Sequence, residues 1–307
     1  MANWSQLLKE IDSAGTTHDA IRRKYLKRLS KATGRNVIAY YSGWLQKGFL
    51  AQSGVPFDIN DADKSGFMTA IHKLDRSKGL DLILHTPGGV TSATESIVDY
   101  LRQMFPNNIR AIVPQLALSA GTMMALACNE IAMGAHSSLG PIDPQLGGIA
   151  AHGVVEEAEK AKSEILTNQQ AAAYWQFVLQ KYRPAFIGDC QKAITWANKM
   201  VKDWLVSGMF SGDADATAKA DAVVAELADH SLTLSHDRHI SLQRAKDMGL
   251  KVIALESDDN LQDAVLTVHH AMIHTLAATT AIKIIENHLG HRFVTTANAQ
   301  LLVSHQS

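Results

Sequence analysis

Strand patterns alternate with helix patterns over residues 36–133, and this alternation restricts the chain to a small set of folds. Strands are expected at 36–41, 80–84, 109–113 and 130–133, with helices at 67–73, 91–105 and 119–128 between them. Such alternation is typical of βαβ units around a parallel sheet. Right-handed crossovers place the turns after Leu84 and Val113 at the same carboxyl edge, where α/β proteins usually bind ligands.

The rest of the chain has helical patterns. One helix is expected over residues 5–32, and others over 154–182, 187–210, 214–228, 240–248 and 260–288. The pattern predicts an N-terminal helical segment (1–35), an α/β core (36–150) and a mainly helical extension (151–307). The extension is expected to pack on the core, with helices that offer interfaces to neighbouring subunits.

Composition excludes several classes of protein. The net charge of -1 in 307 residues leaves no broad basic surface, so no nucleic-acid partner is expected. Two cysteines, Cys128 and Cys190, are too few for a secreted disulfide framework and fit small core residues. The N-terminus lacks a secretion signal, and the apolar stretches are too short to span a membrane. A cytoplasmic protein is therefore expected.

Two short segments after the predicted strands carry candidate chemistry. Gly88 and Gly89 follow the strand that ends at Leu84, and a glycine pair exposes amide hydrogens without obstruction by side chains. Ser119 lies at a predicted helix start, where Ala120 would supply another amide. A serine nucleophile facing an oxyanion hole needs these groups. The plainer interpretation of Ser119 is an ordinary helix N-cap.

Three motifs resemble one known family. His85-Thr86-Pro87-Gly88-Gly89, Ser119-Ala120-Gly121-Thr122-Met123 and Ser138-Leu139-Gly140-Pro141-Ile142-Asp143-Pro144-Gln145 are similar to the serine dehydrogenase proteinase family. That family lies within the ClpP/crotonase fold and is related to the signal-peptide peptidase SppA. The resemblance implies a Clp-fold serine peptidase that acts on a peptide or protein, forms a homo-oligomer and needs no cofactor. No Gly-x-Gly-x-x-Gly motif follows any predicted strand, so nicotinamide chemistry is not expected.

The general base is the open part of this hypothesis. ClpP uses a histidine, and an ungapped alignment puts Pro141 near that position, with His136 five residues earlier. SppA-like enzymes use a lysine, for which Lys160 has the best spacing. A Ser119–Lys160 dyad is therefore expected, although Lys160 and its neighbour Lys162 lie in a Glu/Lys-rich run typical of a solvated helix. His236 is a more distant candidate.

Other residues have candidate roles around the same site. Val90 and Thr91 are expected to present a backbone edge along which a peptide adds as a strand. Asp143 and Gln145 either shape the pocket or belong to a stiff turn between prolines.

The sequence also bears on a metal site and on two rival functions. The 14 histidines include two close pairs, His270/His274 and His236/His239, but neither forms a His-Glu-x-x-His motif, so no metal is expected. A crotonase-like acyl-CoA enzyme would use the same amides with a carboxylate in place of Ser119. A catalytically inactive Clp-fold scaffold is the non-enzymatic alternative.

Overall fold

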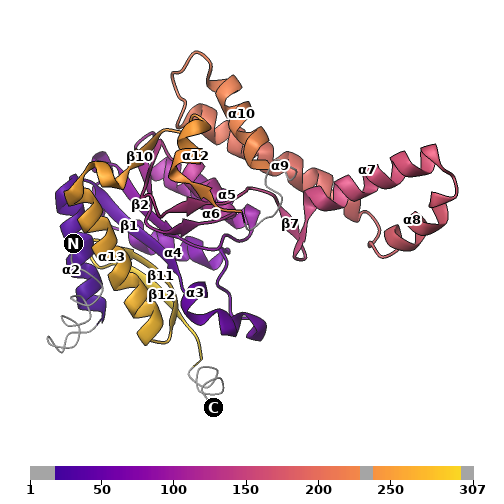
Figure 1. The fold of residues 1–307 in the computed structure, drawn as a ribbon. Helices are drawn as coiled ribbons and strands as arrows, with labels where there is room; N and C mark the ends of the chain where they lie inside the picture. The colour runs from indigo at the N-terminus through magenta and orange to yellow at the C-terminus, as the bar shows by residue number, and fades with distance from the viewer. Residues whose placement is uncertain (1–17, 229–237, 299–307) are drawn as a thin grey trace.

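The protein has an α/β fold built on one large mixed sheet (Figure 1). The computed structural model describes residues 18–228 and 238–298. Within them, seven strands lie in the order β10-β5-β3-β2-β1-β11-β12. Their bounds are β1 Asn36–Ser42, β2 Leu80–His85, β3 Ile109–Val113, β5 Glu130–Met133, β10 Val252–Ala254, β11 Ala281–Asn287 and β12 Arg292–Thr296. The first five run parallel, and β11 and β12 are antiparallel to their neighbours.

The sheet is buried on both faces. Along β1, Ile38 and Tyr40 enter one hydrophobic core, whereas Val37, Ala39 and Tyr41 enter the other, as the alternating direction of side chains on a strand requires. The first core is formed with α4 (Ala62–Ile71), α5 (Thr91–Met104), α6 (Ala120–Leu126), α9 (Phe186–Ser207) and α10 (Ala216–Ala228). The second is formed with α2 (His18–Thr33) and α13 (Asp259–Ala278).

The remaining elements of residues 18–228 and 238–298 are short, except for an arm that projects from the body (Figure 1). The arm consists of α7 (Ala151–Thr167) and α8 (Ala171–Leu179) and follows a hairpin of β7 (Gln145–Leu146) and β8 (Ile149–Ala150). The other short elements are α3 (Trp44–Lys47), α12 (Leu242–Asp247), three 3-10 helices (Gly48–Ser53, Arg76–Lys78, Leu255–Ser257) and the small sheet of β4 (Leu116–Ala117), β6 (Ser138–Leu139) and β9 (Ile240–Ser241).

The structure corrects several predicted boundaries. The final helix ends at Ala278, and residues 281–287, expected to be helical, form β11. The long helix expected over 154–182 is divided, because α7 ends at Thr167 and α8 begins at Ala171. Part of the helix expected over 5–32 is seen as α2, and residues 5–17 of it lie outside the described residues.

The part of the chain after residue 151 is mainly helical, but it is not only an extension. Strands β10, β11 and β12 come from this part and join the central sheet on both sides of the 36–150 strands. The predicted boundary at 150/151 therefore does not separate the sheet from the rest of the chain. The physical reason is that β1 and β5 would otherwise be unpaired edges of a buried sheet.

A buried ion pair fixes β11 against α2. Arg22 Nε lies 2.7 Å from Glu286 Oε2, and their side chains are 1% and 0% exposed. Burial raises the pKa of Glu286 above its ordinary value of 4.5, although the adjacent Arg22 guanidinium opposes this shift. The folded protein thus holds this proton more tightly than the unfolded chain does. The contribution of Glu286 to stability therefore falls as pH rises from near 4.5 through the folded pKa.

Replacing Arg22 by methionine is expected to lower the free energy of unfolding by about 3–5 kcal/mol, because Glu286 loses its buried partner. The folded pKa of Glu286 rises further in this variant, so the deficit should be larger at pH 8 than at pH 5. Urea unfolding at pH 5 and at pH 8 measures this deficit in the free energy of unfolding. Arg28→Met is the control: Arg28 is half-exposed in its pair with Asp263, so about 1 kcal/mol or less is expected. Equal losses in the two variants would contradict the argument.

Candidate active site

Ser119 occupies a strained turn between β4 and α6. Its backbone has φ 51° and ψ −117°, a conformation that is costly for any residue with a Cβ. Its side chain makes no capping hydrogen bond, so the plain N-cap interpretation is wrong. The turn is held by Thr122, whose Oγ1 donates to the carbonyl of Ala117 (2.8 Å) and accepts from the amide of Gly140 (2.9 Å). Strain that the surrounding structure maintains is typical of functional sites.

The glycine loop after β2 lies directly against this turn. A Cβ on Gly88 would lie 2.7 Å from the Cβ of Ser119 and 3.1 Å from the amide nitrogen of Ala120. Gly88 also has φ 104°. No side chain fits this approach, so the glycine at 88 brings the loop and the Ser119 turn together. The two segments that the sequence analysis singled out therefore meet at the carboxyl edge of the sheet.

The two glycines of this loop differ in what their amides do. The Gly88 N–H donates to Thr86 Oγ1 at 3.2 Å. In the described part of the chain, the amides of Gly89 and Ala120 have no hydrogen-bond acceptor, and both residues line the same pocket as Ser119. The free donors beside Ser119 are thus those of Gly89 and Ala120, while Gly88 provides the close approach.

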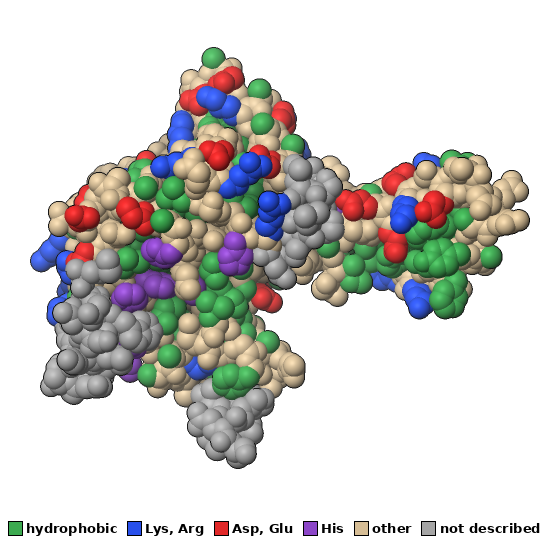
Figure 2. Space-filling model, in the orientation of Figure 1, with side chains coloured by type: hydrophobic (Ala, Val, Ile, Leu, Met, Phe, Trp, Pro, Cys, Tyr) green, Lys and Arg blue, Asp and Glu red, His purple; other side chains and the backbone are tan. Residues whose placement is uncertain are grey.

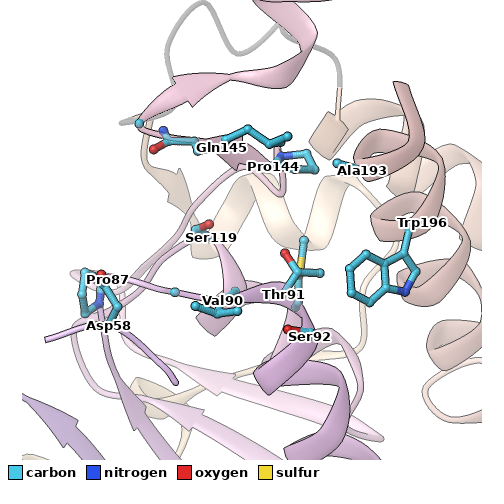
Figure 3. Close-up of a pocket in the computed structure, with 15 residues that line it drawn as sticks. Asp58, Pro87, Val90, Thr91, Ser92, Ser119, Pro144, Gln145, Ala193 and Trp196 are labelled. Carbon is cyan, nitrogen blue, oxygen red and sulfur yellow. The ribbon is translucent and has the colours of Figure 1, made fainter. Parts of the chain in front are cut away.

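The pocket beside Ser119 has a volume of about 630 Å³ (Figure 3). One wall is formed by residues between Pro87 and Ser92, and the facing wall by Pro144, Gln145, Leu146 and Gly148. Ala193 and Trp196 of α9 close one end, and Asp58 lies beside Pro87 at the other (Figure 3). Of the described residues that line the pocket, Asp58 alone has an ionisable side chain.

Val90 and Thr91 line this pocket, but the predicted peptide-binding edge is partly occupied. The Val90 N–H donates to the carbonyl of Ile59 (2.9 Å), and the Ile59 N–H donates to the carbonyl of Gly88 (2.8 Å). The chain itself therefore pairs with this side of the loop. A peptide cannot bond to the Val90 amide, because Ile59 already does; the unpaired Gly89 amide remains.

The predicted bases lie outside the pocket lining. Lys160 and Lys162 are exposed on α7, and Lys162 pairs with Glu159 (3.7 Å). A lysine acts as a base at neutral pH when burial disfavours its charge, and neither position is buried. His136 is exposed, with Nε2 bonded to the carbonyl of Pro114 at 2.9 Å. His236 lies outside the described residues.

Sequence reasoning missed the partner of Asp143. His152 Nδ1 lies 2.6 Å from Asp143 Oδ1, and the side chains are 19% and 2% exposed, respectively. The other carboxylate oxygen, Oδ2, is buried without a hydrogen-bond partner in the described structure. The sequence pattern indicates only a pocket or turn role for Asp143. Gly147-Gly148 in the middle of the intervening segment was the available signal, since a hairpin there brings residue 152 back to 143.

Other titratable groups near the sheet are locked by packing. Burial lowers the pKa of His85 to about 3, and its ring packs among Tyr41, Trp44 and His269. Burial raises the pKa of the Cys128 thiol to about 12, so this cysteine is a core residue. His85 is therefore a neutral ring packed at the end of β2.

The histidine pair His270 and His274 lies on α13, where His274 is buried. Among residues 18–228 and 238–298, no three or more His, Cys, Asp or Glu side chains are grouped to hold a metal ion. In the same residues, no helix is long and apolar enough to cross a membrane.

Comparison with known proteins gives a matching family model, two related proteins and a similar solved structure. A family model described as ClpP-like SDH-type serine proteinase matches residues 12–285. The uncharacterized protein MJ0137 of Methanocaldococcus jannaschii is 30% identical over 248 residues, which cover 80% of this chain and 77% of that protein. The uncharacterized protein MJ1495 of the same organism is 27% identical over 237 residues, covering 75% and 71%.

A solved structure is also similar. It is a serine-to-alanine mutant of the 1510-N membrane-bound stomatin-specific protease, with 19% identity, a TM-score of 0.41, and coverage of 66% of this chain and 77% of that one.

Proposed function

Because this chain belongs to the family of ClpP-like SDH-type serine proteinases, we propose that it hydrolyses peptide bonds through an acyl-enzyme on Ser119. The observation that carries the proposal is the contact between the glycine loop and the strained Ser119 turn inside an open pocket. This contact brings the Ser119 turn to a pocket that is also lined by Gly89 and Ala120, whose amides have no acceptor in the described structure. An acyl-transfer site requires this combination.

In the proposed reaction, Ser119 Oγ attacks the carbonyl carbon of the substrate and loses its proton to a base. The carbonyl oxygen gains negative charge, and the amides of Gly89 and Ala120 stabilise it. The intermediate collapses as the C–N bond breaks and the leaving amine takes the proton from the base. Water then attacks the ester by the same route and releases the acid, so no cofactor is consumed.

A peptide is proposed to lie extended between the two walls of the pocket. Residues 87–91 and the β7 strand flank Ser119 from opposite sides, so a bound segment would lie between two backbones. The end closed by Trp196 is also lined by Met123 and Ala193. An apolar substrate side chain fits this end, because it buries apolar surface there without leaving a polar group unpaired.

The dyad expected from the resemblance would require Lys160 to reach the pocket. Lys160 lies on the projecting α7 and is exposed in this protomer. A Ser119–Lys160 dyad therefore depends on a rearrangement of α7 or on a second copy of the chain.

We also propose a cytoplasmic homo-oligomer. The α7–α8 arm carries exposed apolar side chains, among them Leu166 (79% exposed), Tyr174 (63%) and Phe177 (59%), and Figure 2 shows hydrophobic groups gathered on it. A projecting apolar surface of this kind is suited to a subunit contact. The proposal includes a peptide or protein substrate and no nucleic-acid partner.

Fluorophosphonate labelling tests the proposed function. We expect the probe to modify the wild-type protein, and peptide mapping to place the adduct on Ser119. Folded protein that remains unlabelled would contradict the proposal. Thermal stabilisation by coenzyme A would then identify the crotonase-like alternative, and its absence would favour an inactive scaffold.

A further inference from the structure

The pocket beside Ser119 carries a charged side chain that the proposed reaction does not use. Asp58 is exposed at the end of the pocket opposite Trp196, and it alone among the described lining residues has an ionisable side chain (Figure 3). Within residues 18–228 and 238–298, the hydrogen bonds to Asp58 from the side chains of Asn60 and Lys283 go to its backbone carbonyl. The carboxylate is therefore available to a ligand in the pocket.

A buried network fixes the backbone of Asp58. Lys283 Nζ donates to the Asp58 carbonyl at 2.7 Å and pairs with Asp63 at 2.9 Å, and the side chains of Lys283 and Asp63 are 3% and 1% exposed. The Tyr40 hydroxyl donates to the same Asp63 carboxylate at 2.9 Å. Because Asp63 supplies the counter-charge for Lys283, the negative charge of Asp58 is not neutralised by this ammonium group.

The next residue connects Asp58 to the glycine loop. The Ile59 N–H donates to the carbonyl of Gly88 at 2.8 Å, and the Val90 N–H donates to the carbonyl of Ile59 at 2.9 Å. The backbones are so close that a Cβ on Gly89 would lie 2.3 Å from the Ile59 nitrogen. The position of Asp58 is thus tied to the Gly89 amide, which is one of the two donors proposed for the substrate carbonyl oxygen.

We propose that Asp58 selects substrates with a lysine or arginine on the side of the scissile bond away from the apolar residue. This inference rests on the proposed function and names the substrate class of the same site. Trp196 and Asp58 lie at opposite ends of the pocket, and Figure 3 shows Ser119 between them. An extended peptide with an apolar side chain at Trp196 therefore runs past Ser119 toward Asp58. A cationic side chain there forms an ion pair with the carboxylate, whereas an acidic one is repelled.

The test uses internally quenched peptides with one apolar residue before the scissile bond and Lys, Gln or Glu at one of the three positions after it. At one of these positions, kcat/KM of the wild-type protein is expected to be about 2- to 5-fold higher with Lys than with Gln, and lowest with Glu. The preference should weaken between about 0.05 and about 0.5 M NaCl, because salt screens an exposed ion pair. Asp58→Asn should remove the preference, and Asp58→Lys should reverse it in favour of Glu.

Asp61→Asn is the matched control, because Asp61 is also exposed, lies three residues further along the chain and does not line the pocket. It should keep the wild-type preference for Lys. Equal kcat/KM for the Lys and Gln peptides at every position, or a Lys preference that survives in Asp58→Lys, would overturn the inference.

A binding measurement separates this inference from the proposed function. Fluorescence anisotropy of labelled Lys and Gln peptides with the Ser119→Ala variant makes the same comparison without turnover, and Asp58→Asn added to that variant should abolish the difference in Kd. Wild-type protein that cleaves none of the peptides, while the Lys peptide still binds more tightly through Asp58, would overturn the proposed function alone. Cleavage of the peptides with equal binding of the two would overturn only the inference.

Discussion

Replacing Ser119 by alanine is expected to abolish peptide hydrolysis, with kcat lowered by about 10⁴-fold or more. The reason is that the other hydroxyls that line the pocket, those of Thr91 and Ser92, lie at the start of α5 and not on the turn that meets Gly88, and Cys128 is buried. The residual rate would come from the amides and the binding groove alone. A fluorogenic peptide with an apolar residue before the scissile bond measures the loss.

A second variant, Ser119→Gly, separates the loss of the hydroxyl from the backbone strain at this position. The φ of 51° and ψ of −117° are costly with a Cβ but not for glycine. Ser119→Gly and Ser119→Ala should therefore be equally inactive, while the glycine variant has the higher free energy of unfolding by about 1 kcal/mol. That difference would show that the strained backbone at residue 119 is maintained because it positions the hydroxyl. Full activity in either variant would exclude Ser119 as the nucleophile.

Four of the parallel strands, β1, β2, β3 and β5, could be predicted from the sequence because they are short apolar runs between helix patterns, whereas the parallel strand β10 was not predicted. The antiparallel strand β11 could not be predicted either. Lys283 and Glu286 interrupt its apolar pattern, and both are buried only because distant residues, Asp63 and Arg22, pair with them. The hydrophobic pattern of a short stretch of sequence does not reveal such distant partners. The break between α7 and α8 was missed for a related reason, since the residues there are compatible with a helix.

The candidate site was predictable as far as chain topology determines it. The crossover rule brings the Gly88 loop and Ser119 to one edge of the sheet, and the structure places them in contact. Which amide is free depends on Thr86 and Ile59, whose hydrogen bonds arise from tertiary packing. The partner of Asp143 was hidden in the same way, because a hairpin rather than a helical spacing brings His152 back.

Replacing Gly88 by alanine is expected to lower kcat/KM by about 10²- to 10³-fold while the protein remains folded. The added methyl group would lie 2.7 Å from the Ser119 Cβ and 2.8 Å from the carbonyl oxygen of Leu118, so the loop and the nucleophile turn must separate. A displacement near 1 Å at reacting groups costs this much, as does the loss of one oxyanion donor. Fluorophosphonate labelling should slow in parallel with peptide hydrolysis.

Gly54→Ala is the matched control for this prediction. Gly54 also has a positive φ, 73°, but a Cβ there meets nothing within 4 Å. Both variants therefore carry a similar backbone cost of about 1–2 kcal/mol in the free energy of unfolding, and only Gly88→Ala adds a clash against Ser119. Gly54→Ala should keep wild-type kcat/KM at a temperature where both proteins are folded. If the two variants lose activity equally, the loss reflects backbone strain, and the close approach of the glycine loop to Ser119 is not what catalysis requires.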